Sequence, residues 1–166
     1  SPLKNDVPVS KADFPVNFIM NTMPKPAAFQ EKPKQKDSKR YGGYLVNAAG
    51  CVDCHSEHEK GSVIAGTELG GGMAFHLPTG TVTAPNITFD QASGIGKWNK
   101  AAFIARFKLY AAQNYIAPEV VKGTMNTPMP WTVYGGMKER DLGAIYDYLN
   151  SVKPIKNEVV RFTPAP

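Results

Sequence analysis

The spacing of apolar residues predicts three helices in the chain after residue 37. The first begins at Ser38, a residue type that caps helix N-termini well, and runs directly into a pair of cysteines. The second covers about residues 100 to 111 after its cap Asn99, and the third covers about 138 to 152 before Pro154 stops it. The apolar face of the first helix consists of Tyr41, Tyr44, Leu45, Ala48 and Val52.

Glycines and turn-forming residues separate these helices. Residues 56 to 96 are rich in both, which predicts loops with a short hairpin around residues 78 to 80. Pro118 suits the first turn of a helix, so we expect a short helical turn over 117 to 122. A proline-bearing loop over 123 to 131 then leads to the last helix. Gly42 and Gly43 lower helix propensity within the first helix, and a close helix–helix crossing would explain their use.

The two ends of the chain lack such periodicity. Residues 1 to 37 are rich in proline and read as an irregular extension and linker, although the apolar stretch 14–29 favours contact with a domain surface. The residues after the last helix read as a tail. The expected organisation is an extension over 1–37, one domain over 38–157 and a C-terminal tail over 158–166.

Composition and charge narrow the classes of function. A chain of 166 residues with 42% apolar and 20% charged residues suits one globular domain with an extension. The net charge of +5 comes from lysines and arginines scattered along the whole chain. This distribution argues against nucleic-acid binding and favours docking on an acidic protein partner.

No apolar run approaches the roughly 18 to 20 residues that span a bilayer. The chain begins at Ser1 without a methionine, so we expect a signal peptide or a membrane anchor upstream of Ser1.

The stretch "CVDCH" (51–55) holds both cysteines of the chain. A thioredoxin-like dithiol would follow a strand, whereas here a helix leads into the cysteines. A structural zinc site would use two ligand pairs that are well separated in sequence, and a disulfide between Cys51 and Cys54 would close a very small loop. C-x-x-C-H is the signature of covalent haem attachment.

The geometry of a helical turn fits this last interpretation. The three-residue spacing places both sulfur atoms on one side of the turn, where each can form a thioether with a haem vinyl group. His55 follows at once and can ligate the iron as its proximal ligand. The sequence therefore predicts one haem c held by Cys51, Cys54 and His55.

The second axial ligand decides what the haem does. His58 lies too close to His55 to reach the opposite haem face, and His76 reads as a loop histidine. Met129 stands between two prolines just before the last helix, which stiffens its backbone, and Met125 is the reserve candidate. A methionine ligand favours Fe(II) and leaves no open position for substrate chemistry, so Met129 predicts an electron carrier.

Three stretches carry a family resemblance: "YLVNAAGCVDCH" (44–55), "TAPNITFDQASGIGKW" (83–98) and "MPWTVYGGMKERDLGAIYDYL" (129–149). They resemble class I c-type cytochromes, especially the cytochrome c modules of membrane-bound bacterial alcohol and aldehyde dehydrogenase subunits. The resemblance implies an all-α cytochrome c fold whose helices and long loops wrap around haem c. Its first and last helices would cross, with Gly43 and Tyr44 near Tyr146 or Tyr148. It implies axial ligation by His55 and Met129, and further cofactor contacts from Tyr44, Pro85, Ile87, Trp98 and Trp131.

The expected function is transfer of one electron at a time rather than catalysis. The resemblance implies a monomeric carrier in the periplasm, or anchored at the periplasmic face of the inner membrane. Its partners would be redox proteins: a donor dehydrogenase, or an acceptor oxidase or reductase. Three alternatives stay open: a haem sensor or peroxidase with a displaceable sixth ligand, the electron-accepting module of a larger dehydrogenase complex, and a purely structural domain of such a complex.

Overall fold

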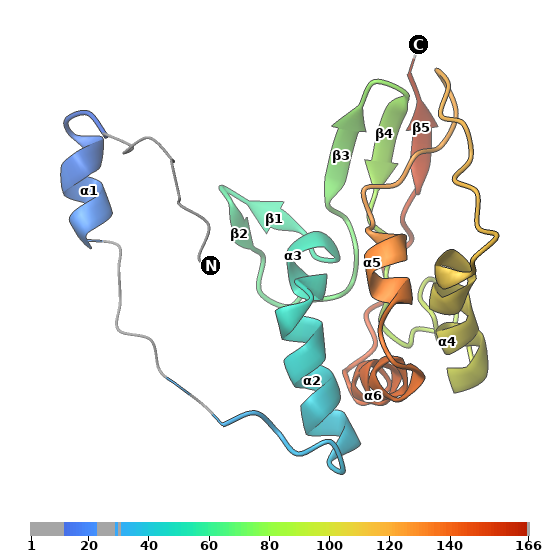
Figure 1. Ribbon diagram of the computed structural model, residues 1–166. Coiled ribbons are helices and arrows are strands. Elements are labelled where there is room, and N and C mark those ends of the chain that lie inside the picture. The colour runs from blue at the N-terminus through green and yellow to red at the C-terminus, as the bar shows by residue number, and fades with distance from the viewer. Residues whose placement is uncertain (1–11, 23–28, 30, 166) are drawn as a thin grey trace, which may run out of the picture. The chain divides into compact units, whose positions relative to one another are not determined.

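The computed structural model describes residues 12–22, 29 and 31–165 (Figure 1). The chain divides into two compact units, Ser1–Glu31 and Lys32–Pro166. In the first unit, α1 (Val16–Thr22) forms part of the stretch expected to be irregular, and the rings of Phe14 and Phe18 pack edge to face at 6.0 Å. Residues 23–28 of that apolar stretch lie outside the described residues.

The second unit is built on the crossing of two helices. Helix α6 (Glu139–Leu149) lies between α2 (Ser38–Ala48) and α4 (Lys100–Lys108) (Figure 1). A Cβ atom on Gly42 would overlap the carbonyl oxygen of Ala144, so only glycine permits this approach. The predicted crossing of the first and last helices is confirmed: Gly42 lies against the backbone of Ala144, and Gly43 lies against the ring of Tyr148. Buried apolar side chains fill the space around it: Val46, Leu69, Ile95, Phe103, Leu142, Ile145 and Leu149.

Two shorter helical elements follow α4 in the chain. The 3₁₀ helix η1 (Leu109–Ala111) continues α4, whose predicted cap is confirmed because the Asn99 side chain accepts a hydrogen bond from the Ala102 amide at 2.8 Å. Helix α5 (Trp131–Gly135) precedes α6. The prediction of a helical turn over 117–122 is wrong, since no helix forms there. Val120 and Val121 are β-branched and exposed, so neither propensity nor burial stabilises a helix at that position.

The expectation of an all-α fold is wrong, because the second unit contains two antiparallel sheets. Strand β1 (His58–Glu59) pairs with β2 (Ser62–Val63), and β3 (Ala74–Leu77) pairs with β4 (Gly80–Thr83) in the predicted hairpin. Strand β5 (Phe162–Pro164), within the expected tail, pairs with the other edge of β4. The physical reason lies in β4, whose β-branched residues alternate in burial, a pattern that suits a central strand and not a loop.

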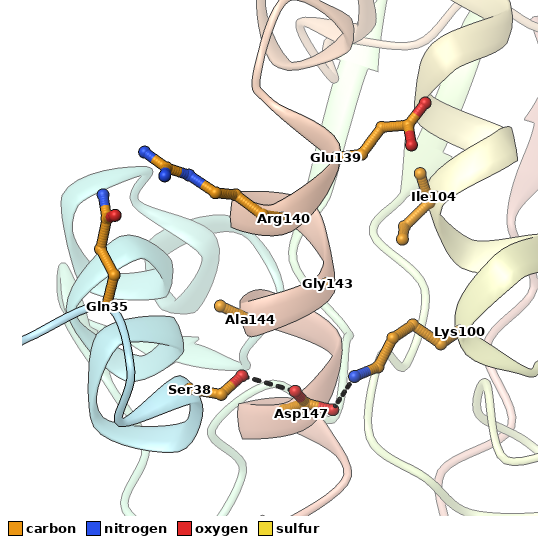
Figure 2. Close-up of a pocket in the computed structure, with 9 residues that line it drawn as sticks. All are labelled: Gln35, Ser38, Lys100, Ile104, Glu139, Arg140, Gly143, Ala144 and Asp147. Carbon is orange, nitrogen blue, oxygen red and sulfur yellow. Dashed lines mark hydrogen bonds and ion pairs between the residues drawn. The ribbon is translucent and has the colours of Figure 1, made fainter.

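A single carboxylate joins the three helices at one end of the unit (Figure 2). Asp147 on α6 accepts a hydrogen bond from the Ser38 hydroxyl at 2.5 Å and pairs with the Lys100 ammonium at 2.6 Å. Ser38 is thus not the cap of α2. Asp37 takes that role and accepts a hydrogen bond from the Arg40 amide at 3.2 Å.

A cleft of about 400 Å³ lies beside this carboxylate, at the N-terminal end of α2, whereas the cysteines follow its C-terminal end. The cleft is therefore a feature of the helix junction, separated from the cysteines by the length of α2. Among the described residues, no helix combines the length and the apolar character that crossing a bilayer requires.

Candidate functional site

The cysteines lie on α3 (Cys51–Cys54), a single helical turn that starts after Gly50. Gly50 adopts a left-handed conformation with φ of 64°, which lets the chain turn sharply out of α2. Both cysteines are free thiols, with Cys51 half-buried and Cys54 exposed. Burial, reinforced by the neighbouring Cys54, raises the pKa of the Cys51 thiol to about 11.

The surroundings of the cysteines argue against a catalytic dithiol and against a zinc site. Catalytic dithiols lower the pKa of one cysteine to create a thiolate at neutral pH, and the pKa of Cys51 moves the other way. Zinc needs several converging ligands, and the described residues contain no cluster of three or more histidine, cysteine, aspartate or glutamate side chains. Two free thiols on one helical turn fit covalent attachment.

His55 caps the C-terminal end of α3 and is buried, with 8% of its surface exposed. Its Nδ1 lies 2.8 Å from the carbonyl oxygen of Pro85, so Nδ1 must carry the hydrogen and donate it. Burial lowers the pKa of His55, although the bond to Pro85 acts in the opposite direction. The result is a neutral imidazole whose Nε2 lone pair is free, which is the form that ligates a metal.

The carbonyl of Pro85 is itself held by a buried polar network. Asn86 is 2% exposed and donates from Nδ2 to the carbonyl oxygen of Ile155 at 2.6 Å. Its Oδ1 accepts hydrogen bonds from the amide and the hydroxyl of Thr88, at 2.9 and 2.7 Å. The network fixes the backbone next to Pro85, and so fixes the acceptor that orients His55.

Gly71 also contacts His55, next to the peptide that joins Pro85 and Asn86. Its amide donates to the carbonyl oxygen of His55 at 2.8 Å, and it adopts a φ of 81°. A Cβ atom at this position would lie 2.6 Å from the amide nitrogen of Asn86. Hydrogen bonds therefore hold both the backbone carbonyl and the imidazole ring of His55. Sequence reasoning missed Gly71 and the hydrogen bonds of Asn86, for which the only signal was the pair of polar residues Asn86 and Thr88 on either side of Ile87.

Helix α5 is fastened beside the cysteine motif. The hydroxyl of Tyr134 donates to the carbonyl oxygen of Ala49 at 2.7 Å, and Ala49 is the C-cap of α2 directly before Gly50. Burial raises the pKa of Tyr134, and the nearby thiols of Cys51 and Cys54 raise it further. Tyr134 thus lies next to the predicted attachment point, although the sequence analysis did not single it out.

Met129 lies two residues before the start of α5 and is half-buried. Its carbonyl accepts from the Trp131 amide at 2.8 Å, and its amide donates to the Thr127 hydroxyl at 3.2 Å. Met125, the reserve candidate, is 53% exposed on the same loop. Of the two methionines, Met129 is therefore the one coupled to the helix that contacts the cysteine motif.

Trp131 packs against α4 and η1. Its ring stacks on Tyr110 at 4.8 Å and contacts Phe107 at 5.2 Å, with the Arg106 guanidinium 5.0 Å from the ring centre. This stack anchors the start of α5 and hence the loop that ends at Met129.

The other expected cofactor contacts occupy different surroundings. Ile87 packs against the hydrophobic core, and its amide donates to the carbonyl oxygen of Leu69 at 2.9 Å. Trp98 is 37% exposed, and its carbonyl accepts from the hydroxyl of Tyr146 at 3.0 Å. Tyr44 is 42% exposed and stacks on Tyr41. Pro85 is thus the expected contact that the structure joins directly to His55.

The two remaining histidines belong to the hairpins. His58 lies in β1 with Nδ1 3.1 Å from the carbonyl oxygen of Ser56, and His76 lies in β3 with Nδ1 3.1 Å from the hydroxyl of Thr81. The side chains that fit a covalently held haem are therefore the free thiols of α3, the neutral imidazole of His55 and the methionine beside α5.

Comparison with known proteins agrees with this chemistry. The cytochrome c family model matches residues 40–153. The chain is 31% identical over 115 residues to the gluconate 2-dehydrogenase cytochrome c subunit of Pantoea cypripedii, covering 69% of this chain and 23% of that protein. It is 32% identical over 119 residues to a subunit of the nicotinate dehydrogenase of Pseudomonas putida, covering 70% and 9%. It is 29% identical over 119 residues to the fructose dehydrogenase cytochrome subunit of Gluconobacter japonicus, covering 69% and 21%.

The chain thus spans less than a quarter of the length of each of these relatives. The match includes the cysteine motif, α4 and α6, and it confirms the resemblance found in the three sequence stretches. The relatives from Pantoea cypripedii and Gluconobacter japonicus are cytochrome subunits of dehydrogenases, which agrees with the expectation of an electron carrier rather than a catalytic subunit. The chain belongs to the cytochrome c family, whose cofactor is haem c.

Proposed function

We propose that this chain carries one electron at a time on a single haem c, attached through Cys51 and Cys54 and ligated by His55 and Met129. The observation that carries the proposal is the 2.8 Å hydrogen bond from His55 Nδ1 to Pro85, which leaves Nε2 free as a ligand. Haem iron supplies a one-electron redox couple when bound, and a methionine ligand favours its Fe(II) form.

The residues of the chain then have separate tasks. Cys51 and Cys54 fix the cofactor to α3, and Pro85 holds the imidazole of His55 in one orientation. Burial of His55 keeps water away from the proximal side. Met129 would supply the thioether that ligates the iron together with the His55 imidazole, which would leave no open position for a substrate. These tasks describe a carrier in which the ligands stay in place during electron transfer.

Replacement of Met129 tests the ligand assignment. Met129→Ala should abolish the weak iron–methionine charge-transfer absorption of the ferric protein and lower its reduction potential, because the soft thioether is lost. Met125→Ala on the same loop is the matched control and should leave both unchanged. A Met129→Ala protein that keeps the absorption would remove Met129 from the proposal, and a high-spin spectrum of the unaltered protein would favour the sensor or peroxidase alternative.

We further propose a dehydrogenase subunit as the electron donor, on the periplasmic side of the inner membrane, either free or anchored. The named relatives are subunits of dehydrogenases, and the net charge of +5 suits docking on an acidic surface. Haem reduction by such a donor should slow as salt is added, since screening weakens charge attraction over about 10 Å at 0.1 M. A rate that does not depend on ionic strength would contradict the acidic docking surface.

A further inference from the structure

Helix α5 is attached to the rest of the fold on two sides. On one side, Lys108 of α4 donates to the carbonyl oxygen of Gly135 at 3.0 Å and to that of Met137. A Cβ atom on Gly135 would lie 2.9 Å from the carbonyl oxygen of Phe107, so α5 fits tightly against α4. On the other side, the hydroxyl of Tyr134 donates the hydrogen bond that links α5 to the end of α2.

The Tyr134 bond joins segments that are far apart in sequence. Donor and acceptor are separated by 85 positions, and their O–O distance is 2.7 Å. The acceptor, Ala49, caps the C-terminus of α2, where backbone carbonyls lack partners within the helix. Tyr134 satisfies one of these carbonyls directly before the turn that carries the cysteines, and it does so from the helix that follows Met129.

We propose that Tyr134 is a positioning residue for the methionine ligand: its hydroxyl fastens the methionine-bearing loop to the cysteine-bearing turn and thereby strengthens the hold of Met129 on the iron. The inference rests on the proposed His55 and Met129 ligation. The side chain of Tyr134 thus couples the turn that carries the cysteines to the loop that carries Met129.

Competition by an external ligand tests the proposal. Tyr134→Phe keeps the ring and removes the hydroxyl alone. Imidazole added to the ferric holoprotein should displace the methionine about fivefold more readily in this variant, which is the effect of losing one neutral hydrogen bond. The loss of the iron–methionine absorption measures the displacement. Tyr148→Phe, which removes a hydroxyl from a half-buried tyrosine on α6, is the matched control and should bind imidazole as the unaltered protein does.

A second pair of proteins separates positioning from a general structural role. In the Met129→Ala background no methionine competes, so adding Tyr134→Phe should leave imidazole affinity unchanged. An equal change in both backgrounds, or no change in the Met129-containing protein, overturns the proposal while the ligand assignment stands. If Met129→Ala alone keeps the iron–methionine absorption, the ligand assignment is wrong and the positioning role of Tyr134 falls with it.

Discussion

The two sides of the proposed haem site are built in opposite ways. His55 is 8% exposed and is held by backbone contacts to Pro85 and Gly71, behind which lies the buried network of Asn86. The segment from residue 112 to 130, which ends in the loop that carries Met129, exposes most of its apolar side chains, among them Ile116 at 87% and Met125 at 53%. The histidine side is therefore preorganised, whereas the methionine side depends on a few attachments at α5. Ligand exchange, where it occurs, should begin at the methionine.

The largest expected contrast comes from removing an asparagine on each side. Asn86→Ala removes the hydrogen bonds of Asn86 to Ser93, Ile155 and Thr88 and leaves the buried Thr88 amide without its partner, which should lower the free energy of unfolding by about 4 kcal/mol. Asn126→Ala removes an exposed side chain from the methionine loop and should change it by less than about 0.5 kcal/mol. Denaturant unfolding of the haem-loaded proteins measures both values. Equal losses would show that the two sides are equally rigid.

Two glycines with nearly equal φ give the next contrast. Gly71→Ala adds a methyl group 2.6 Å from the amide nitrogen of Asn86, on top of the strain of a positive φ, and should cost about 3 kcal/mol. Gly123 on the methionine loop has a φ of 79° and nothing within 4 Å of an added Cβ. Gly123→Ala should therefore cost only the backbone strain of about 1 kcal/mol. The comparison fails if both substitutions shift the denaturation midpoint by the same amount.

The smallest effect is expected at Asp147, away from the cysteine motif. Burial alone would raise the pKa of Asp147, but the hydrogen bonds from Lys100 and Ser38 outweigh it and hold the pKa below its usual value. The ionised carboxylate therefore stabilises the fold above about pH 4, and this contribution is lost as the pH falls through the lowered pKa. Asp147→Asn should cost less than about 1 kcal/mol at neutral pH, since the ion pair is partly exposed.

Unfolding curves measured from neutral to acidic pH test this last prediction. Asp147→Asn should flatten the acid part of the stability profile and leave the iron–methionine absorption unchanged. Glu139→Gln, on the same helix and lining the same cleft, provides the control. A change in the iron–methionine absorption of the Asp147→Asn protein would show that the helix junction affects the loop that carries Met129. That result would contradict the prediction.

Local patterns predicted the parts of the site that lie close together in sequence. The C-x-x-C-H spacing predicted Cys51, Cys54 and His55 as the residues that hold the haem, and helical periodicity located α2, α4 and α6 close to their observed bounds. The hairpin of β3 and β4 followed from a turn flanked by β-branched residues. In each case the physical cause acts within a few residues, so it is visible in a single stretch of sequence.

The remaining features depend on partners distant in the chain. Asn86 and Ile155 are 69 positions apart, and nothing in "PNIT" indicates that its amide will donate to a carbonyl beyond α6. Strand β5 forms because it pairs with the free edge of β4. Its own residues carry no strand pattern, so the sequence alone predicts a tail there. The helical turn expected over 117–122 failed for the converse reason, because no neighbouring element buries Val120 or Val121. Tertiary contacts decided all three outcomes.

The dependence of Asn86 on Ile155 has a consequence for biosynthesis. A chain emerging from the ribosome exposes its cysteine motif early, when Pro85 still lacks the support that comes from beyond α6. Translation must add Ile155 before the acceptor of His55 is fixed, and β5 must follow before the sheet is complete. A polypeptide that ends before Ile155 would therefore lack the carbonyl that accepts the hydrogen bond of the Asn86 side chain, next to Pro85. The segment after α6 therefore completes the histidine side of the site and the sheet only after the rest of the domain has been synthesised.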